Sequence, residues 1–358
     1  MRILLKKYLF DSPAFIIECH KLSEVERAFA RMERAVKDGY YLAGFFSYEA
    51  GYAFEEVFHD NKIYDFPLVC FGAYRKPTSP AHANRPPSPF KMERGKQQGA
   101  RKDYLKAIRK IKRLIAAGET YQINYTFRQR FGFAGEPFAL YQRLKASQPT
   151  AYSAFIESKD FSILSLSPEL FFRKTGGRIA VKPMKGTIGP GRDNAGKLKN
   201  DKKNRAENIM IVDLLRNDLG RIAKTGSVRT KKLFEVEKLK TLYQMTSTVE
   251  ARVAPDIELF ELFRNIYPSG SVTGAPKIRA MQIIRELEKE ERKIYTGSIG
   301  FITPQKDMVF NVAIRTLLLH PYPSSSLPVP LFRCELGLGS GIIFDSEPEA
   351  EFEECRLK

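Results

Sequence analysis

Histidine, cysteine and tryptophan are scarce in this chain, and their scarcity excludes several kinds of catalytic site. The 358 residues include four histidines, four cysteines and no tryptophan. Cys19, Cys70, Cys334 and Cys355 show no Cys-x-x-Cys or metal-like spacing, so we expect neither a disulfide framework nor a zinc site. The histidines lie in the first region, a proline-rich stretch and a late loop, so a Ser-His-Asp or Cys-His site is poorly supported.

Long apolar runs are also absent. No stretch of eighteen apolar residues occurs, which excludes a membrane-spanning helix. The apolar run after Met1 is too short for a signal peptide. We therefore expect a cytoplasmic protein without a membrane partner. The length suffices for a large core and for about two domains.

Basic residues outnumber acidic ones, and the resulting positive charge indicates which kinds of binding partner the protein attracts. Lys and Arg total 59 against 41 Asp and Glu, a net charge of +18. Such a charge attracts anions, from nucleic acid to small dicarboxylates. No RNA-binding or DNA-binding sequence signature occurs. The basic residues of 101–113 alternate with apolar ones at helical spacing, which favours a solvated helix face. A nucleic-acid-binding protein is therefore a distant alternative.

The order of segments predicts an α+β fold with antiparallel sheets, because strands follow one another as hairpins and helices fall in separate blocks. We expect an N-terminal region, 1–98, that ends in a proline-rich linker and belongs to the same sandwich as the main region, 99–358. One strand is predicted over Met308–Leu319. Neither a GxxxxGK[ST] loop nor a GxGxxG turn after a strand occurs, which disfavours nucleotide binding.

Carboxylates and lysines remain as candidates for chemistry. Glu169 follows a proline at a strand junction, where a partly apolar setting would raise the pKa of a carboxyl. Lys185 lies between Met and Gly in a loop, and a desolvated lysine amine is a nucleophile. Taken singly, a surface glutamate and an ordinary loop lysine are the simpler interpretations.

A second group of carboxylates lies on two predicted helices. Glu207 begins the buried stretch of a helix, and Glu351 and Glu354 share one face of the C-terminal helix. Together they would suit a hard cation such as Mg²⁺. The competing interpretation of the C-terminal pair is a solvated acidic helix start, which the helix dipole favours.

In their order along the chain these blocks resemble the chorismate-utilising enzyme family. The resemblance covers roughly residues 100–358, and 39–51 more weakly. Its motifs are GETYQIN (118–124), SPELF (167–171), PMKGT (183–187), RAENIMIVDLLRNDLGR (205–221), YPSGSVTGAPKIRAM (267–281), YTGSIG (295–300), AIRT (313–316) and GLGSGIIFDSEPEAEFEE (337–354). It implies two large antiparallel sheets packed face to face with helices outside.

The resemblance also implies a role for each site residue. Glu207 and Glu354 would ligate Mg²⁺, with Glu351 near the ion through water, and the ion would hold the ring carboxylate of chorismate. Glu169 would be the general acid that protonates the leaving 4-hydroxyl group. Substrate binding is implied for seven positions: Gln122, Thr187, Ser271, Tyr295, Arg315, Gly339 and Lys358.

Two positions discriminate among members of the family. Gln122 stands where water-adding members carry a lysine base, which disfavours isochorismate and salicylate chemistry. Lys185 stands where anthranilate synthases carry alanine and aminodeoxychorismate synthases carry lysine. The resemblance thus implies that Lys185 attacks ring C2 and that ammonia then adds at C4, giving 4-amino-4-deoxychorismate for 4-aminobenzoate and folate synthesis. An anthranilate synthase large subunit is the alternative.

No cysteine lies in a glutaminase nucleophile elbow, so we expect a separate glutamine amidotransferase subunit to supply the ammonia. Two departures from the family pattern are present. Gln244 stands where several members have a histidine near the ring. Relatives also continue the helix past Lys358, and a natural end here and a piece of a longer chain are both compatible with that departure.

Overall fold

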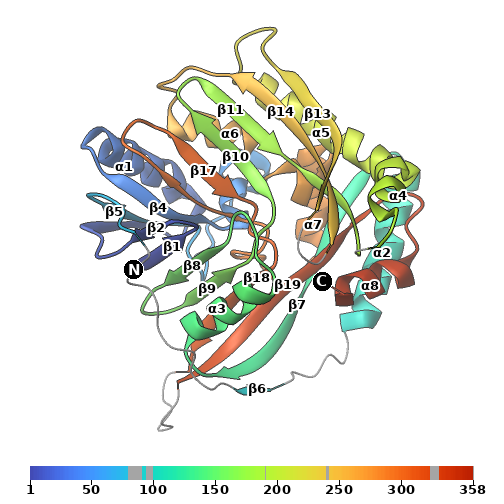
Figure 1. The fold of residues 1–358 in the computed structure, drawn as a ribbon, viewed down its shortest axis with the longest axis horizontal. Helices are drawn as coiled ribbons and strands as arrows, with labels where there is room; N and C mark the ends of the chain where they lie inside the picture. Colours follow the sequence, from blue (N-terminus) through green and yellow to red (C-terminus); the bar gives the residue numbers. More distant parts are fainter. Residues whose placement is uncertain (80–90, 94–99, 190, 239–241, 323–329, 358) are drawn as a thin grey trace.

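The computed structural model describes residues 1–79, 91–93, 100–189, 191–238, 242–322 and 330–357, and two antiparallel sheets form its framework (Figure 1). One sheet has nine strands in the order β15-β7-β19-β18-β9-β8-β1-β2, with β6 also paired to β7. Its strands are β1 (Arg2–Leu5), β2 (Tyr8–Phe10), β6 (Lys91–Glu93), β7 (Gln122–Ala134), β8 (Ala154–Glu157), β9 (Ser162–Ser165), β15 (Gly274–Ala275), β18 (Thr316–Pro321) and β19 (Leu331–Ile342).

The second sheet has ten strands in the order β12-β14-β11-β10-β17-β16-β4-β5-β3, with β13 also paired to β14. These strands are β3 (Phe15–Cys19), β4 (Tyr41–Phe46), β5 (Val69–Tyr74), β10 (Leu170–Thr175), β11 (Arg178–Lys182), β12 (Met184–Ile188), β13 (Arg229–Lys238), β14 (Tyr243–Arg252), β16 (Ser298–Ile302) and β17 (Met308–Asn311). The predicted α+β class with two antiparallel sheets is confirmed.

Helices flank the sheets: α2 and α8 pack together against β7 and β19, whereas α4 packs against β12, β13 and β14 of the other sheet (Figure 1). None of the described helices is both long and apolar enough to span a bilayer. The α-helices are α1 (Val25–Lys37), α2 (Ala100–Ala116), α3 (Pro137–Ser147), α4 (Asn194–Asn200), α5 (Lys202–Gly220), α6 (Leu259–Ile266), α7 (Lys277–Leu287) and α8 (Pro348–Leu357). The short 3-10 helices are η1 (Leu22–Glu24), η2 (Tyr48–Phe54), η3 (Glu56–Phe58) and η5 (Gly270–Val272).

The first 79 residues contribute strands to both sheets. In the nine-stranded sheet β1 pairs with β8, and in the ten-stranded sheet β4 pairs with β16. Long-range pairs of this kind bury the N-terminal strands against residues more than a hundred positions away. The division predicted at residues 98–99 falls outside the described residues and stays a prediction.

The single strand predicted over Met308–Leu319 is wrong. The chain forms β17 in the ten-stranded sheet, crosses between the sheets at 312–315, and continues as β18 in the other sheet. Arg315 has a positive φ of 51° at this crossing, a conformation that breaks an extended strand. Residues on both sides of the crossing are buried, so the apolar pattern runs through it without a break.

Aromatic rings pack the ten-stranded sheet against the helix α6. The ring of Phe263 lies 4.5 Å from that of Phe46 in β4 and 5.2 Å from that of Phe310 in β17, measured between centroids. All three side chains are almost completely buried. Each ring buries a large apolar area and the tilted contacts add to it, so this cluster is a main source of stability.

Replacing Phe310 by alanine should lower the free energy of unfolding by about 3–5 kcal/mol, because a cavity replaces the ring inside this cluster. Urea unfolding followed by circular dichroism measures the change. Phe344→Ala is the control, since that ring is 61% exposed and its removal should change stability by about 0.5 kcal/mol or less. Equal losses in the two variants would contradict the packing described here.

Candidate active site

The amine of Lys185 lies where the two sheets meet. Lys185 belongs to β12 of the ten-stranded sheet, and Gln122 and Gly341 belong to β7 and β19 of the nine-stranded sheet. A Cβ atom added at Gly341 would lie 2.5 Å from Gln122 Nε2 and 3.3 Å from Lys185 Nζ. The side chains of Gln122 and Lys185 therefore converge on the glycine backbone of β19, in space that any larger residue would fill.

Glu169 is a buried carboxyl next to this lysine. It stands immediately before β10, with only 4% of its surface exposed. Burial raises its pKa to about 7, although hydrogen bonds from the Ser271 hydroxyl and the Met184 backbone N–H and the charge of Lys185 all oppose the rise. A carboxyl of this kind holds a proton near neutral pH and can donate it to a leaving group. Glu169 is thus buried, and the simpler interpretation of a surface glutamate is wrong.

The segment that carries Ser271 is held by a network centred on Arg292. The Arg292 guanidinium donates to the carbonyl oxygens of Val272, at 2.8 Å, and Asn124, at 2.5 Å. Glu288 forms an ion pair with it at 2.7 Å, and the backbone N–H of Arg292 donates to Glu49. Since Asn124 lies on β7 near Gln122, Arg292 links the segment that carries Ser271 to the strand that carries Gln122.

Sequence reasoning missed this network, although a signal was present. Glu288 and Arg292 are spaced four apart at the end of α7, only three residues before the motif that begins at Tyr295. Glu49 lies in the weaker N-terminal resemblance. Burial raises the pKa of Glu49 to about 7, even though the backbone N–H groups of Arg292 and Lys293 donate to its carboxyl.

The predicted carboxylate-binding residues lie along β19 and the crossing between the sheets. The Tyr295 ring packs where a side chain at Gly337 would otherwise stand, and Gly339 pairs with Thr126 of β7. The carbonyl oxygen of Arg315 accepts a hydrogen bond from Leu166, three residues before Glu169.

The guanidinium of Arg315 is partly buried, and burial lowers its pKa. It forms no hydrogen bond or ion pair with any other described side chain. A cation removed from water without a partner is well suited to bind an anion.

Three carboxylates approach one another between α5 and α8. Burial raises the pKa of Glu207, Lys185 and Lys203 lower it, and the charges of Glu351 and Glu354 raise it further. Glu351 is buried and accepts a 2.7 Å hydrogen bond from the Ser346 hydroxyl. Within the described ranges, however, no three His, Cys, Asp or Glu side chains gather closely enough to enclose a metal ion.

The donor set nevertheless fits Mg²⁺. This ion keeps several waters and takes one or two carboxylates together with oxygens of the substrate, so an enclosing cluster is not required. Burial is the main cause of the raised Glu207 pKa and the charges of Glu351 and Glu354 add to it; a bound cation would offset both.

The remaining predicted positions are placed as follows. Thr187 is exposed in β12, directly opposite Gln244 of β14. Gln244 and Gln122 are both buried, and the side-chain carbonyl oxygen of each has no hydrogen-bond partner among the described residues. The side-chain oxygens of Gln122 and Gln244 are therefore two acceptors that no described residue uses. Lys358 lies outside the described residues.

Comparison with known proteins agrees with this geometry. Residues 9–358 match the model of the chorismate binding enzyme family, and the chain therefore belongs to that family. It is 35% identical over 261 residues to aminodeoxychorismate synthase component 1 of Bacillus subtilis, an alignment that covers 71% of this chain and 53% of that relative. It is 37% identical over 253 residues to anthranilate synthase component 1 of Aquifex aeolicus, covering 69% and 49%.

The fold agrees with a solved structure over the whole chain. Anthranilate synthase component I of Streptococcus pneumoniae superimposes with a TM-score of 0.79 at 25% identity, covering 100% of this chain and 91% of that one. The sandwich expected from the resemblance is thereby confirmed. In sequence, by contrast, the aligned region spans about half the length of the curated relatives named above.

Replacing Glu169 by glutamine should remove part of the pH dependence of stability. The folded protein retains a proton on Glu169 between pH 4.5 and about 7, whereas the unfolded protein releases it, so the free energy of unfolding falls as the pH rises through this range. The fall is on the order of 3 kcal/mol for such a shift. Urea unfolding at pH 5 and pH 8 compares Glu169→Gln with the wild type.

Glu49→Gln is the matched control, because it removes the other buried carboxyl whose pKa is raised to about 7 and leaves the contribution of Glu169 in place. Both single variants should show a shallower decline than the wild type. A decline in Glu169→Gln as steep as that of the wild type would show that Glu169 is ionised in the folded protein throughout.

Proposed function

We propose that this chain converts chorismate and ammonia into 4-amino-4-deoxychorismate. The observation that carries the proposal is the position of the Lys185 amine, which lies beside Gln122 at the meeting of the two sheets and close to the buried carboxyl of Glu169. A nucleophile and a proton donor side by side are what a substitution at an allylic alcohol needs. By the resemblance described above, anthranilate-forming relatives have no amine at this position.

The reaction proceeds in two substitutions. The Lys185 nitrogen attacks ring C2 and loses a proton, the ring double bonds shift, and the C4–O bond breaks as Glu169 protonates the departing hydroxyl, which leaves as water. Ammonia then attacks C4 and loses a proton, the double bonds shift back, and the C2–N bond breaks as the Lys185 nitrogen takes up a proton and returns to the free amine. The raised pKa of Glu169 supports its part as the acid, since an ionised carboxylate could not donate the proton.

Substrate binding falls to residues around this pair. Arg315, Tyr295 and Gly339 hold the enolpyruvyl carboxylate side. The strongest support for this assignment is the partly buried guanidinium of Arg315, which has no partner among the side chains that the structure describes. Ser271 contacts the other end of the substrate. Thr187, Gln122 and Lys358 complete the proposed binding set.

A magnesium ion belongs to the proposal. Glu207 and Glu354 would hold it, with Glu351 near it, and the ion would orient the ring carboxylate and offset its charge. The raised pKa of Glu207 among neighbouring carboxylates supports this assignment. The ion would bind the carboxylate at C1, which leaves C2 to Lys185 and the C4 hydroxyl group to Glu169.

Gln122 excludes water as the nucleophile. A neutral amide has no basic nitrogen, so it cannot remove a proton from water as a lysine at this position would. Its side chain lies beside Lys185 Nζ, where a base for water addition would have to act. The site therefore favours amination over the formation of isochorismate or salicylate.

The ammonia is proposed to come from a separate glutamine amidotransferase subunit in the cytoplasm. The relatives named component 1 imply a second component. The product would serve 4-aminobenzoate and folate synthesis. An anthranilate synthase large subunit is the second candidate, and it is favoured by the match to anthranilate synthase component I structures and sequences.

The Lys185→Ala variant separates the two candidates. It should lose formation of 4-amino-4-deoxychorismate while it still binds chorismate, because the amine acts on the ring rather than on the carboxylates. Mass spectrometry of the products formed from chorismate, Mg²⁺ and ammonium measures the formation of 4-amino-4-deoxychorismate. Isothermal titration calorimetry measures the binding of chorismate.

Lys182→Ala is the control, since Lys182 lies three residues earlier and pairs with Glu237 instead of facing the site. It should retain amination. Unchanged amination in Lys185→Ala, or anthranilate and pyruvate as the sole products of the wild type, would refute the proposed reaction.

Glu354→Gln should raise the Mg²⁺ concentration needed for half-maximal activity by at least about tenfold, because it removes one proposed ligand. Glu353→Gln is the control. Glu353 is the preceding residue, it is exposed and pairs with Arg356, so its replacement should leave the Mg²⁺ requirement unchanged. Initial rates measured across a series of Mg²⁺ concentrations compare the two variants. Equal Mg²⁺ requirements in both would remove Glu354 from the ion site.

A further inference from the structure

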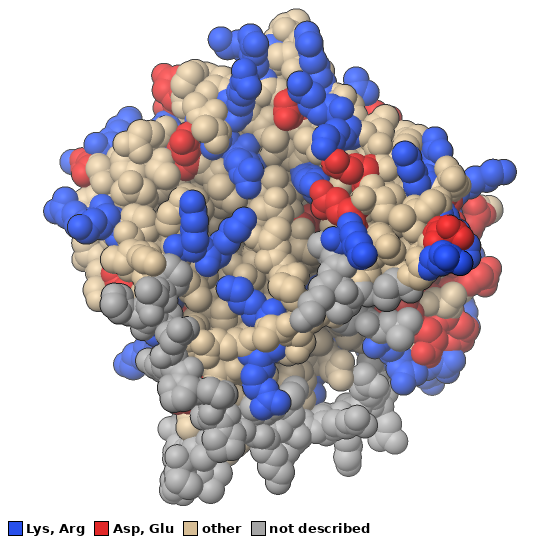
Figure 2. Space-filling model, in the orientation of Figure 1, with Lys and Arg blue, Asp and Glu red and all other residues tan. Residues whose placement is uncertain are grey.

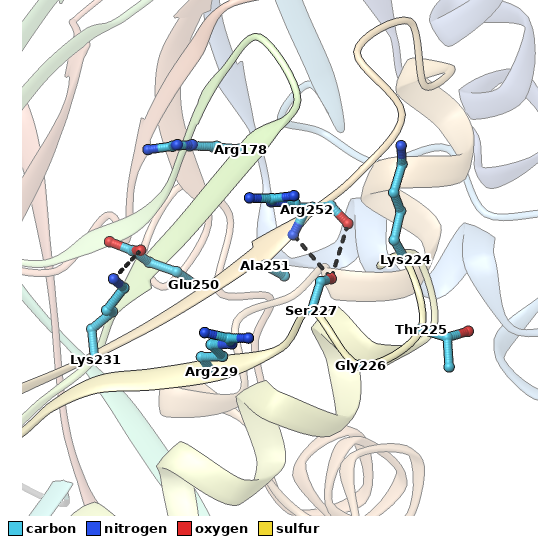
Figure 3. Close-up of a pocket in the computed structure, with 10 residues that line it drawn as sticks. All are labelled: Arg178, Lys224, Thr225, Gly226, Ser227, Arg229, Lys231, Glu250, Ala251 and Arg252. Atoms are coloured by element: carbon cyan, nitrogen blue, oxygen red, sulfur yellow. Dashed lines mark hydrogen bonds and ion pairs between the residues drawn. The ribbon is translucent and has the colours of Figure 1, made fainter.

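A basic cleft lies at the far end of α5 from Glu207. Its cavity measures about 460 Å³ and opens between the loop after α5 and the ends of β11, β13 and β14 (Figure 3). Five of its lining residues are basic and one is acidic: Arg178, Lys224, Arg229, Lys231, Arg252 and Glu250. Gly220 lies thirteen positions after Glu207 along this helix, a rise of roughly 20 Å, so the cleft is distinct from the active site.

Two arginines of the cleft are paired on neighbouring strands. In the pairing of β11 with β14, Arg178 stands directly opposite Arg252, and Figure 3 shows the two side chains lying next to each other. Neither forms an ion pair with an acidic side chain in the part of the chain that the structure describes. Like charges directly opposite on neighbouring strands destabilise a sheet, so this pair has an energetic cost in the absence of an anion.

The remaining residues of the cleft do not neutralise its positive charge. The Glu250 carboxylate lies 3.9 Å from Lys231 Nζ, and Glu250 is also the cross-strand partner of Arg229. One carboxylate thus serves two cations, while Lys224 has no acidic partner within the described residues. Figure 2 shows that Lys and Arg outnumber Asp and Glu over the visible face as well.

Backbone donors add to the cationic side chains. Lys224 donates its backbone N–H to the carbonyl oxygen of Arg252 at 2.7 Å, and the Ser227 hydroxyl accepts from the Arg252 N–H at 3.1 Å, which ties the loop to β14. Gly226 takes a φ of 72°, open to glycine without strain. The N–H groups of Thr225 and Gly226 donate to no other described residue, so they remain available to a ligand.

We propose that this cleft binds a compact polyanion that carries at least two phosphate or carboxylate groups. Arginine guanidinium groups bind such oxygens in bidentate pairs, and free backbone N–H groups of a turn provide further donors. The bound anion would remove the repulsion between Arg178 and Arg252. The volume of the cleft suits a small molecule with several charges, and the site is independent of the proposed reaction.

The test uses tripolyphosphate and citrate as probes in isothermal titration calorimetry. The wild type should bind at least one of them, and the double variant Arg178→Gln/Arg252→Gln should bind it at least tenfold more weakly. Tripolyphosphate bound more tightly than citrate would identify phosphate as the preferred group, and the reverse would identify carboxylate. The control Arg109→Gln/Lys110→Gln removes the same charge from the exposed face of α2, outside the cleft, and should bind as the wild type does.

Thermal unfolding shows whether the double variant is folded. Without a probe Arg178→Gln/Arg252→Gln should melt no lower than the wild type, since it lacks the repulsion. The probe should raise the melting temperature of the wild type and of the control, but not that of Arg178→Gln/Arg252→Gln. Absence of binding by the wild type, or equal weakening in both double variants, would overturn the proposal. So would tighter binding of a single-stranded oligonucleotide than of either probe, lost in Arg178→Gln/Arg252→Gln, because the cleft would then be a nucleic-acid contact.

Discussion

Removal of the Glu169 carboxyl from water, next to the Lys185 amine, is the constraint on which the proposed chemistry depends. A carboxyl in water would be ionised at neutral pH and could not protonate a leaving hydroxyl group. Burial reverses this preference even though the Ser271 hydroxyl, the Met184 N–H and Lys185 each favour the charged form. Desolvation therefore outweighs three opposing interactions, which supports the proposed parts of Glu169 as acid and Lys185 as nucleophile.

The sandwich maintains this arrangement by linking segments that are distant in the sequence. Arg292 binds carbonyl oxygens on β7 and η5, and it is itself held by Glu288 and by the N-terminal residue Glu49. Removing one partner of such a buried network would leave the others unsatisfied, at a cost of several kcal/mol. The N-terminal region is thus connected to the site through the hydrogen bonds of Glu49 as well as through strand pairing.

Much of the site could be predicted from the sequence because it lies in contiguous blocks. The nearness of Glu207 to Glu351 and Glu354 and the special setting of Glu169 followed from the resemblance of these blocks to the family, whereas Glu169 taken singly was more simply interpreted as a surface glutamate. Arg292 and Glu49 did not, because their roles arise only when strands far apart in sequence pair.

The fold shows the same division between local and long-range information. Hairpin order predicted antiparallel sheets. The crossing at Arg315 was missed because its neighbours are buried in both sheets, so the apolar pattern carries no sign of a change of sheet. The Arg178–Arg252 pair likewise depends on a register that no local pattern contains.

The central claim is that the Lys185 nitrogen bonds to the ring of the substrate, and a trapped adduct tests it most directly. The protein is incubated with chorismate and Mg²⁺ without ammonia, digested, and examined by tandem mass spectrometry. The account predicts a peptide in which Lys185 has gained the mass of chorismate less one water, and this adduct should disappear when ammonium is added. An unmodified Lys185 in a preparation that forms 4-amino-4-deoxychorismate at full rate once ammonium is supplied, with the adduct absent at every time sampled, would contradict it.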